Sequence, residues 1–146
     1  MKKMTCILLS ALLLALSLTG CGSSGSGTSA GGAVSGDGGE RYKIAIVQPM
    51  SHTSLDQIRD TIVAKLNESG KDIQVELENA NNDSTALNTI LSNCKAEGVD
   101  LVIPIATSTA QSAKTVFDGT DTPIVFAAVS DPTAAGLTGD DCRNIT

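Results

Sequence analysis

The sequence predicts an α/β domain whose parallel, doubly wound sheet is covered by helices on both faces, in the order βαβαβαβ over residues 42–146. Short apolar runs alternate there with longer segments in which apolar residues recur every three or four positions. The runs are almost continuously apolar, which is typical of strands buried on both faces. The whole chain has 146 residues, enough for one domain of ordinary size.

The first two strands and the helix between them are predicted as follows. Residues 43–48 (KIAIVQ) are rich in β-branched side chains and form the first strand. Ser54 and Gln57 have the spacing of a capping box, so we expect a helix from this point to Gly70. Residues 73–80 (IQVELENA) begin with strict apolar–polar alternation, which predicts the second strand.

The second half of the domain repeats this alternation. Ser84 is placed to cap a helix that ends at Gly98, and residues 100–106 (DLVIPIA) form a third apolar strand. Ser108 begins another capping-box pattern and therefore a third predicted helix. Residues 123–129 (PIVFAAV) complete the pattern as a fourth predicted strand.

The first forty residues differ in composition from the rest. Residues 1–20 combine an N-terminal pair of lysines with an apolar stretch at 7–16, which is the layout of a secretory signal peptide. The ending Leu-Thr-Gly-Cys at 18–21 resembles a bacterial lipobox, which implies lipidation of Cys21 and a membrane anchor. Residues 21–41 are rich in Gly and Ser and are predicted to be a flexible tether.

Two cysteines remain in the predicted domain. An oxidising compartment would permit a disulfide between Cys94 and Cys142. However, Leu87, Leu91 and Cys94 fall at helical spacing, so we expect Cys94 to be a core thiol and leave Cys142 open.

The composition excludes several classes of protein. The chain has 10 basic and 16 acidic residues, a net charge of −6 and no dense cluster of Lys and Arg, so nucleic acid is not an expected partner. One histidine in the whole chain argues against a multi-histidine metal site. A phosphate-binding Gly-rich loop and a G-x-S-x-G nucleophile elbow are both missing. We therefore expect neither an enzyme nor a bound cofactor or metal.

Ligands of parallel α/β sheets bind beyond the carboxyl ends of the strands. The loops at 48–54, 80–84, 106–110 and 130–136 are therefore the candidates for a binding site. Their side chains are polar and nearly uncharged.

The loop at 106–110 offers an anion site. Thr107, Ser108 and Thr109 stand at a predicted helix start, where free N–H groups, the helix dipole and hydroxyl donors suit a substrate carboxylate. The alternative is that Ser108 simply caps the helix, although capping does not require all three hydroxyls.

Two further loops offer less specific signals. Asp131, next to Ser130, can accept a hydrogen bond from a ligand ammonium, or it can equally form a local turn, which Asp-Pro favours. Gln48 and His52, in the first loop, are further candidate ligand contacts, and the alternative for His52 is a surface histidine.

Several motifs together resemble the tryptophan/tyrosine-type substrate-binding family of ABC transporters. The matching segments cover the predicted domain and read QPMSHTSLD (48–56), NANND (79–83), GVDLV (98–102), ATSTAQ (106–111) and VSDPTAAGL (129–137). The last two are fairly specific together. The chain departs from the family in length, because family members have two lobes and this sequence resembles only the first.

The resemblance implies an N-terminal lobe of the periplasmic-binding-protein type I fold, truncated before the second lobe. It also implies a lipoprotein at the extracytoplasmic face of the cell membrane that captures a small solute, such as an aromatic amino acid, and delivers it to ABC permease subunits. The alternatives are a ligand-sensing ectodomain that signals through a membrane protein, and a solute that is not an amino acid. With one lobe alone, we expect weak binding.

Overall fold

The computed structural model describes residues 41–140 and 142–146. The predicted signal peptide, the lipid site Cys21 and all but the last residue of the predicted tether lie outside the described residues. The order of the regular elements is β1 (Tyr42–Gln48), α1 (Thr53–Glu68), β2 (Ile73–Asn79), α2 (Ser84–Ala96), β3 (Leu101–Pro104) and α3 (Thr107–Val116).

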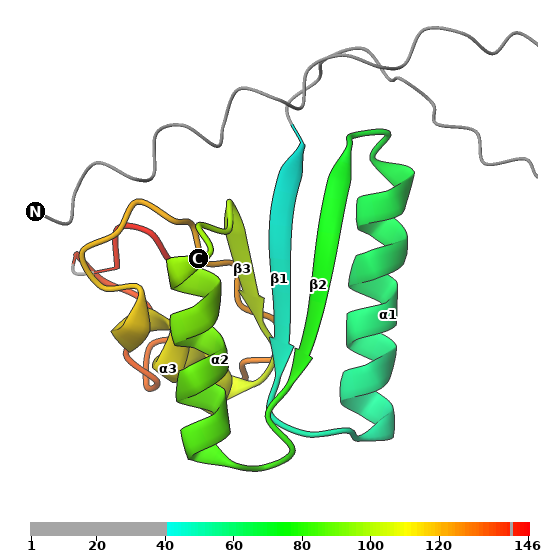
Figure 1. Cartoon of the computed structure of the whole chain (residues 1–146). Helices are drawn as coiled ribbons and strands as arrows, with labels where there is room; N and C mark the ends of the chain where they lie inside the picture. The colour runs from blue at the N-terminus through cyan, green and yellow to red at the C-terminus, as the bar shows by residue number, and fades with distance from the viewer. Residues whose placement is uncertain (1–40, 141) are drawn as a thin grey trace, which may run out of the picture. The chain divides into compact units, whose positions relative to one another are not determined.

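The three strands form a parallel sheet in the order β2-β1-β3 (Figure 1). Helix α1 lies on one face, whereas α2 and α3 pack together on the other (Figure 1). In β1 the side chains alternate between the two faces: Ile44 and Ile46 belong to the core under α1, whereas Ala45 and Val47 belong to the core under α2 and α3. The sequence prediction of a parallel α/β sheet covered on both faces is confirmed.

The predicted fourth strand at 123–129 is wrong as a regular strand. Residues 123–127 do run parallel to β3, with bridges Val102↔Ile124 and Ile105↔Ala127 on either side of Pro104. Val102 N donates to Pro123 O and Ala106 N to Ala127 O, but Pro104, between them, has no N–H to donate. The ladder is therefore interrupted, and only its two ends form bridges.

Residue 124 has a second neighbour on its other side. Ile124 N donates to Asn144 O at 2.6 Å, and Thr146 N donates to Ile124 O at 2.8 Å. This isolated parallel bridge between Ile124 and Ile145 brings the end of the described chain beside the sheet.

Helices α1 and α2 both begin with a side-chain cap, but the cap is not the residue predicted. His52 caps α1, because its Nδ1 accepts from Ser54 N at 3.3 Å. Asp83 caps α2, because its Oδ1 accepts from Thr85 N at 2.7 Å and from Ala86 N at 3.1 Å. The predicted caps Ser54 and Ser84 are instead inside the helices, since a residue before each one already offers an acceptor.

Cys94 is a core thiol, as predicted. Its side chain is buried in the cluster under α2 and α3, and it forms no disulfide with another cysteine of the described residues. Burial raises the pKa of the Cys94 thiol to about 11, and the nearby charges of Glu78, Glu76 and Glu97 add to the rise. Cys142 is also free and is half-buried.

At the amino end of β1, Lys43 joins the sheet to α2. Its Nζ pairs with Glu76 of β2 and with Glu97 at the end of α2. The hydrogen bonds to Glu97 and Glu76 raise the pKa of Lys43.

Among the described residues, no helix has both the length and the apolar character needed to cross a membrane.

Candidate functional site

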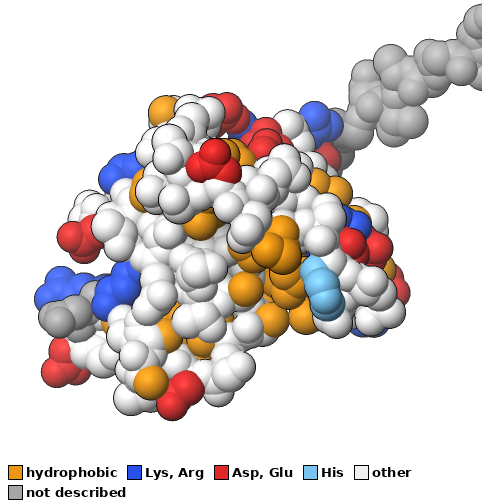
Figure 2. All heavy atoms as spheres, turned by 90° about the horizontal axis from the view of Figure 1, so that it is seen from below, with side chains coloured by type: hydrophobic (Ala, Val, Ile, Leu, Met, Phe, Trp, Pro, Cys, Tyr) orange, Lys and Arg blue, Asp and Glu red, His pale blue; other side chains and the backbone are white. Residues whose placement is uncertain are grey.

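The carboxyl ends of the strands meet at one edge of the sheet, and the loops that leave this edge hold unusual backbone. Four non-glycine residues have positive φ there: Asn81 and Asn82 after β2, Ala106 after β3, and Ala128 after the 123–127 segment. Such backbone costs free energy and is concentrated at functional sites in proteins. Figure 2 shows this edge, where the single histidine, His52, lies next to a patch of hydrophobic side chains.

The N-terminus of α3 has no side-chain cap. Its N-cap residue, Ala106, has φ 78° and ψ 156°. Ala106 N donates to Ala127 O at 2.9 Å, and the first bond that closes a turn of α3 runs from Ala110 N to Ala106 O at 3.0 Å. The alternative reading of Ser108 as a simple cap is therefore wrong, because the turn after β3 makes Ala106 the N-cap.

The three predicted hydroxyl residues all lie in the first turn of α3. Thr107 is half-buried and Ser108 is exposed. Thr109 is fully buried, and its Oγ1 has no hydrogen-bond partner among the described residues. Free helical N–H groups and the positive end of the helix dipole favour an anion at this position.

Gln48 is the last residue of β1 and is only 1% exposed. Its Nε2 donates to Asp56 Oδ1 at 3.0 Å and to Met50 O at 3.2 Å. Its Oε1 is buried and has no partner among the described residues. Ile105 N donates to Val47 O at 2.8 Å, so Gln48 lies next to the connection between β3 and α3.

Asp131 and Ser130 are exposed residues at the start of a turn. Asp131 Oδ1 accepts from Ala134 N at 2.9 Å, and its backbone O accepts from Ala135 N at 3.1 Å. The structure thus shows the local turn that the Asp-Pro pair favours. Contact of Asp131 or Ser130 with a ligand stays a prediction.

The structure places Gln48, at the end of β1, beside the connection between β3 and α3, which leads to Thr107, Ser108 and Thr109. The Gln48 side chain bonds to Asp56 of α1. His52 lies at the same edge but serves as the cap of α1. Asp56, which accepts from both Gln48 and Arg59, is not among the predicted site residues, although it ends the family motif at 48–56. That motif was the signal that could have added Asp56 to the site.

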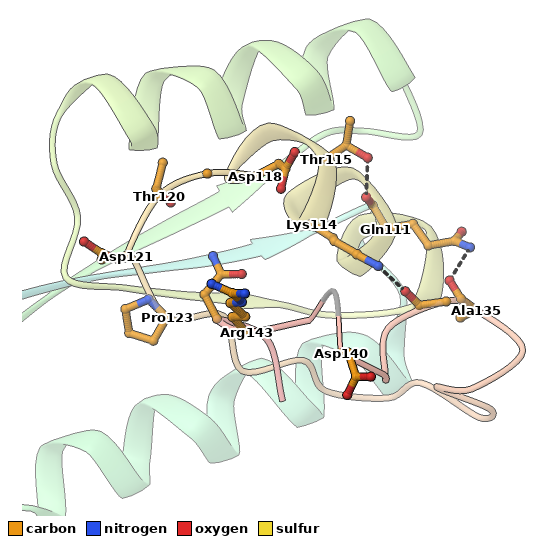
Figure 3. Close-up of a pocket in the computed structure, with 13 residues that line it drawn as sticks. Gln111, Lys114, Thr115, Asp118, Thr120, Asp121, Pro123, Ala135, Asp140 and Arg143 are labelled. Atoms are coloured by element: carbon orange, nitrogen blue, oxygen red, sulfur yellow. Dashed lines mark hydrogen bonds between the residues drawn. The ribbon is translucent and has the colours of Figure 1, made fainter.

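A polar hollow lies elsewhere, along the flank of α3, and contains none of the predicted site residues (Figure 3). Its lining carries both signs of charge, from Lys114 and Arg143 on one hand and Asp118, Asp121 and Asp140 on the other. Hydrogen bonds from Gln111 Nε2 to Ala135 O and from Lys114 Nζ to Gly136 O close one side of this hollow (Figure 3). These bonds fix the turn after Asp131 against α3.

The part of the chain that the structure describes contains no group of three or more His, Cys, Asp or Glu side chains that could hold a metal ion. The candidate site at the strand ends offers hydroxyls, an amide and backbone N–H groups. Such groups recognise a ligand by hydrogen bonds.

Residues 43–146 match the family model described as ABC transporter substrate binding protein. The tyrosine-binding protein of Clostridioides difficile is 31% identical over 141 residues, which cover 93% of this chain and 40% of that protein. This chain thus spans less than half the length of that curated relative.

Solved structures show the same relationship. A domain from Streptococcus pneumoniae in complex with L-Trp is 34% identical, with a TM-score of 0.64, and the match covers 70% of this chain and 36% of that one. A substrate-binding protein with adhesive properties from Clostridium difficile, in its ligand-free open form, is 36% identical with a TM-score of 0.60, over 66% and 34% of the two chains. The resemblance seen in the sequence motifs is confirmed: the chain belongs to the family of ABC transporter substrate-binding proteins, which bind solutes and are not a class of enzymes.

Proposed function

We propose that this protein is a lipoprotein, anchored through Cys21 at the extracytoplasmic face of the membrane, that captures an amino acid for an ABC importer. The amino acid is held between the lobe described above and a second lobe, and closure of the two lobes presents it to the permease. Support for an aromatic amino acid comes from the relatives, one named for tyrosine and one solved with L-Trp.

The open N-terminus of α3 is the observation that carries this proposal. An amino acid brings a carboxylate, and Thr107, Ser108 and Thr109 offer N–H and hydroxyl donors at the positive end of a helix whose cap position holds an alanine. The other two helices that begin at this edge have side-chain caps, from His52 and Asp83.

A thermal-shift panel tests the proposed ligand class. We would use the protein from its complete reading frame, without residues 1–20 and with Cys21→Ser, against the twenty amino acids, several sugars, nucleosides and metal ions. A ligand at 100 times its Kd adds about 2.7 kcal/mol to the free energy of unfolding, which raises the midpoint measurably. A shift with sugars or nucleosides but with no amino acid would overturn the proposal.

A charge substitution then locates the carboxylate. Ser108→Asp places a competing carboxylate in the first turn of α3, so we expect at least a tenfold loss of affinity, or about 1.4 kcal/mol, for the amino acid. The matched control is Ser54→Asp, which adds the same charge at the second residue of α1, also an exposed position. Equal affinity of the two variants would contradict the assignment to α3.

A further inference from the structure

We propose that Gln48 accepts a hydrogen bond from the ammonium group of the bound amino acid, and that Asp56 is the residue that positions Gln48 for this contact. The inference rests on the proposed function. It assigns a role to Asp56, which lies in the first turn of α1 and carries no ligand role in the sequence analysis.

The orientation of the Gln48 amide is fixed by its neighbours. Its Nε2 is 3.0 Å from Asp56 Oδ1 and 3.2 Å from Met50 O. A carboxylate oxygen and a backbone carbonyl can only accept hydrogen bonds. The NH₂ group must therefore face them, because the reverse orientation would set three acceptors against one another.

This orientation leaves the amide oxygen without a donor. Gln48 Oε1 is buried and unpartnered among the described residues, in a side chain that is 1% exposed. A buried acceptor without a donor costs free energy, and a donor supplied by a ligand would remove that cost. The site therefore lacks one N–H donor in the state that the structure shows.

The position of Gln48 suits the ammonium group of an amino acid. Its neighbour Val47 accepts from Ile105 N, one residue before the turn that opens α3. An amino acid whose carboxylate lies at the first turn of α3 carries its ammonium group on the adjacent carbon, and the proposal places that group at the end of β1. Asp131, the other candidate for this group, already accepts from Ala134 N in its own turn.

Asp56 itself is held in place. Its Oδ1 also accepts from Arg59 Nη1 at 3.1 Å, and the Asp56 side chain is 33% exposed. Asp56→Asn replaces the charged acceptor by a neutral amide oxygen, which accepts weaker hydrogen bonds from Gln48 Nε2 and from Arg59 Nη1. We expect this substitution to loosen the orientation of the Gln48 amide and so to weaken the contact between Gln48 Oε1 and the ammonium group.

Isothermal titration of the protein from its complete reading frame, without residues 1–20 and with Cys21→Ser, tests this role. The probes are L-tryptophan and L-tyrosine, each paired with its analogue without the amino group, indole-3-propionate or 3-(4-hydroxyphenyl)propionate. We expect Asp56→Asn to weaken amino-acid binding about tenfold. The matched control is Asp60→Asn, which removes the same charge from the same helix and also loses a pair with Arg59, at 2.8 Å, but does not contact Gln48. We expect less than a twofold change for this control.

Gln48→Met provides the second arm, because it keeps the length of the buried side chain and removes its polar atoms. In this background we expect Asp56→Asn to have no further effect, and the preference for amino acids over the deaminated analogues to shrink about tenfold. Additive effects of the two substitutions, or an unchanged preference, would overturn the inference.

Side-chain amide NMR separates this inference from the proposed function. If the wild-type protein binds no amino acid, the proposed function and the ammonium contact both fail. The role of Asp56 in positioning Gln48 can then still be tested without a ligand. The resonances of the Gln48 Nε2 group must shift in Asp56→Asn and stay unchanged in Asp60→Asn. Identical spectra of the two variants would overturn the positioning role.

Discussion

Helices α2 and α3 pack on the same face of the sheet and begin at the same edge, yet their first turns differ. Asp83 accepts from two N–H groups at the start of α2, whereas α3 starts at Ala106, whose side chain cannot accept. Both starts carry Ser and Thr, so residue type alone does not separate them. Under the proposed function, the capped start of α2 contributes to stability, and the uncapped start of α3 receives the ligand.

The largest expected effect on stability concerns the buried thiol of Cys94 in α2. The pKa of Cys94 is about 11 in the folded protein, above its ordinary value of 9.0. The thiolate is therefore disfavoured only in the folded state, so this contribution to stability is fully present below pH 9 and is lost as the pH rises toward 11. We expect a loss of roughly 1–2 kcal/mol between pH 8 and pH 10, measured by urea unfolding.

Cys94→Ala is the control for this pH dependence. The variant is less stable at every pH because it leaves a cavity in the core. Its stability should decline less between pH 8 and pH 10 than that of the wild type. Parallel profiles of the two proteins would refute the assignment to Cys94.

Next in size is the contribution of the two helix starts themselves. Asp83→Ala removes the acceptor of two N–H groups, so we expect a loss of about 1 kcal/mol in the free energy of unfolding. Ser108→Ala is the matched test at α3, where no side-chain cap bond exists, and should change stability by less than about 0.3 kcal/mol. Chemical denaturation of both variants measures the two losses in the free energy of unfolding. Equal losses would show that the two helix starts do not differ.

The smallest effect concerns the backbone of Ala106. Its φ of 78° is costly for a residue with a Cβ, so Ala106→Gly should stabilise the free protein by about 0.5 kcal/mol, after the entropic cost of glycine. Ala64→Gly, at an exposed position in α1, should destabilise it by about 1 kcal/mol. In thermal melting, we expect the midpoint of Ala106→Gly to rise and that of Ala64→Gly to fall. A lower midpoint for both variants would show that Ala106 is unstrained.

Much of the fold could be predicted because it follows from local patterns. Within the described residues, the alternation of apolar runs with helical spacing located the three regular strands and the three helices to within a few residues. The spacing of Leu87, Leu91 and Cys94 also identified a buried helix face. The prediction of a fourth strand was wrong because Pro104 interrupts the hydrogen-bond ladder to residues 123–127. Whether a missing N–H interrupts a ladder depends on which strand lies beside it.

The candidate site was less predictable for the same reason. Thr107, Ser108 and Thr109 were found from the general rule that ligands bind at strand ends, but their lack of a cap was not. Asp56 was missed, since its contact with Gln48 joins a strand end to the first turn of the next helix across a loop.

The sequence by itself determined the parallel α/β class, the core position of Cys94 and, through its motifs, the family of the chain, because apolar periodicity and short motifs are local properties. Only the tertiary structure decided which helix start stays open and which amide oxygen is left without a donor. A hydrogen bond depends on which donor and acceptor lie close together, and at this edge the donors and acceptors come from separate strands and loops.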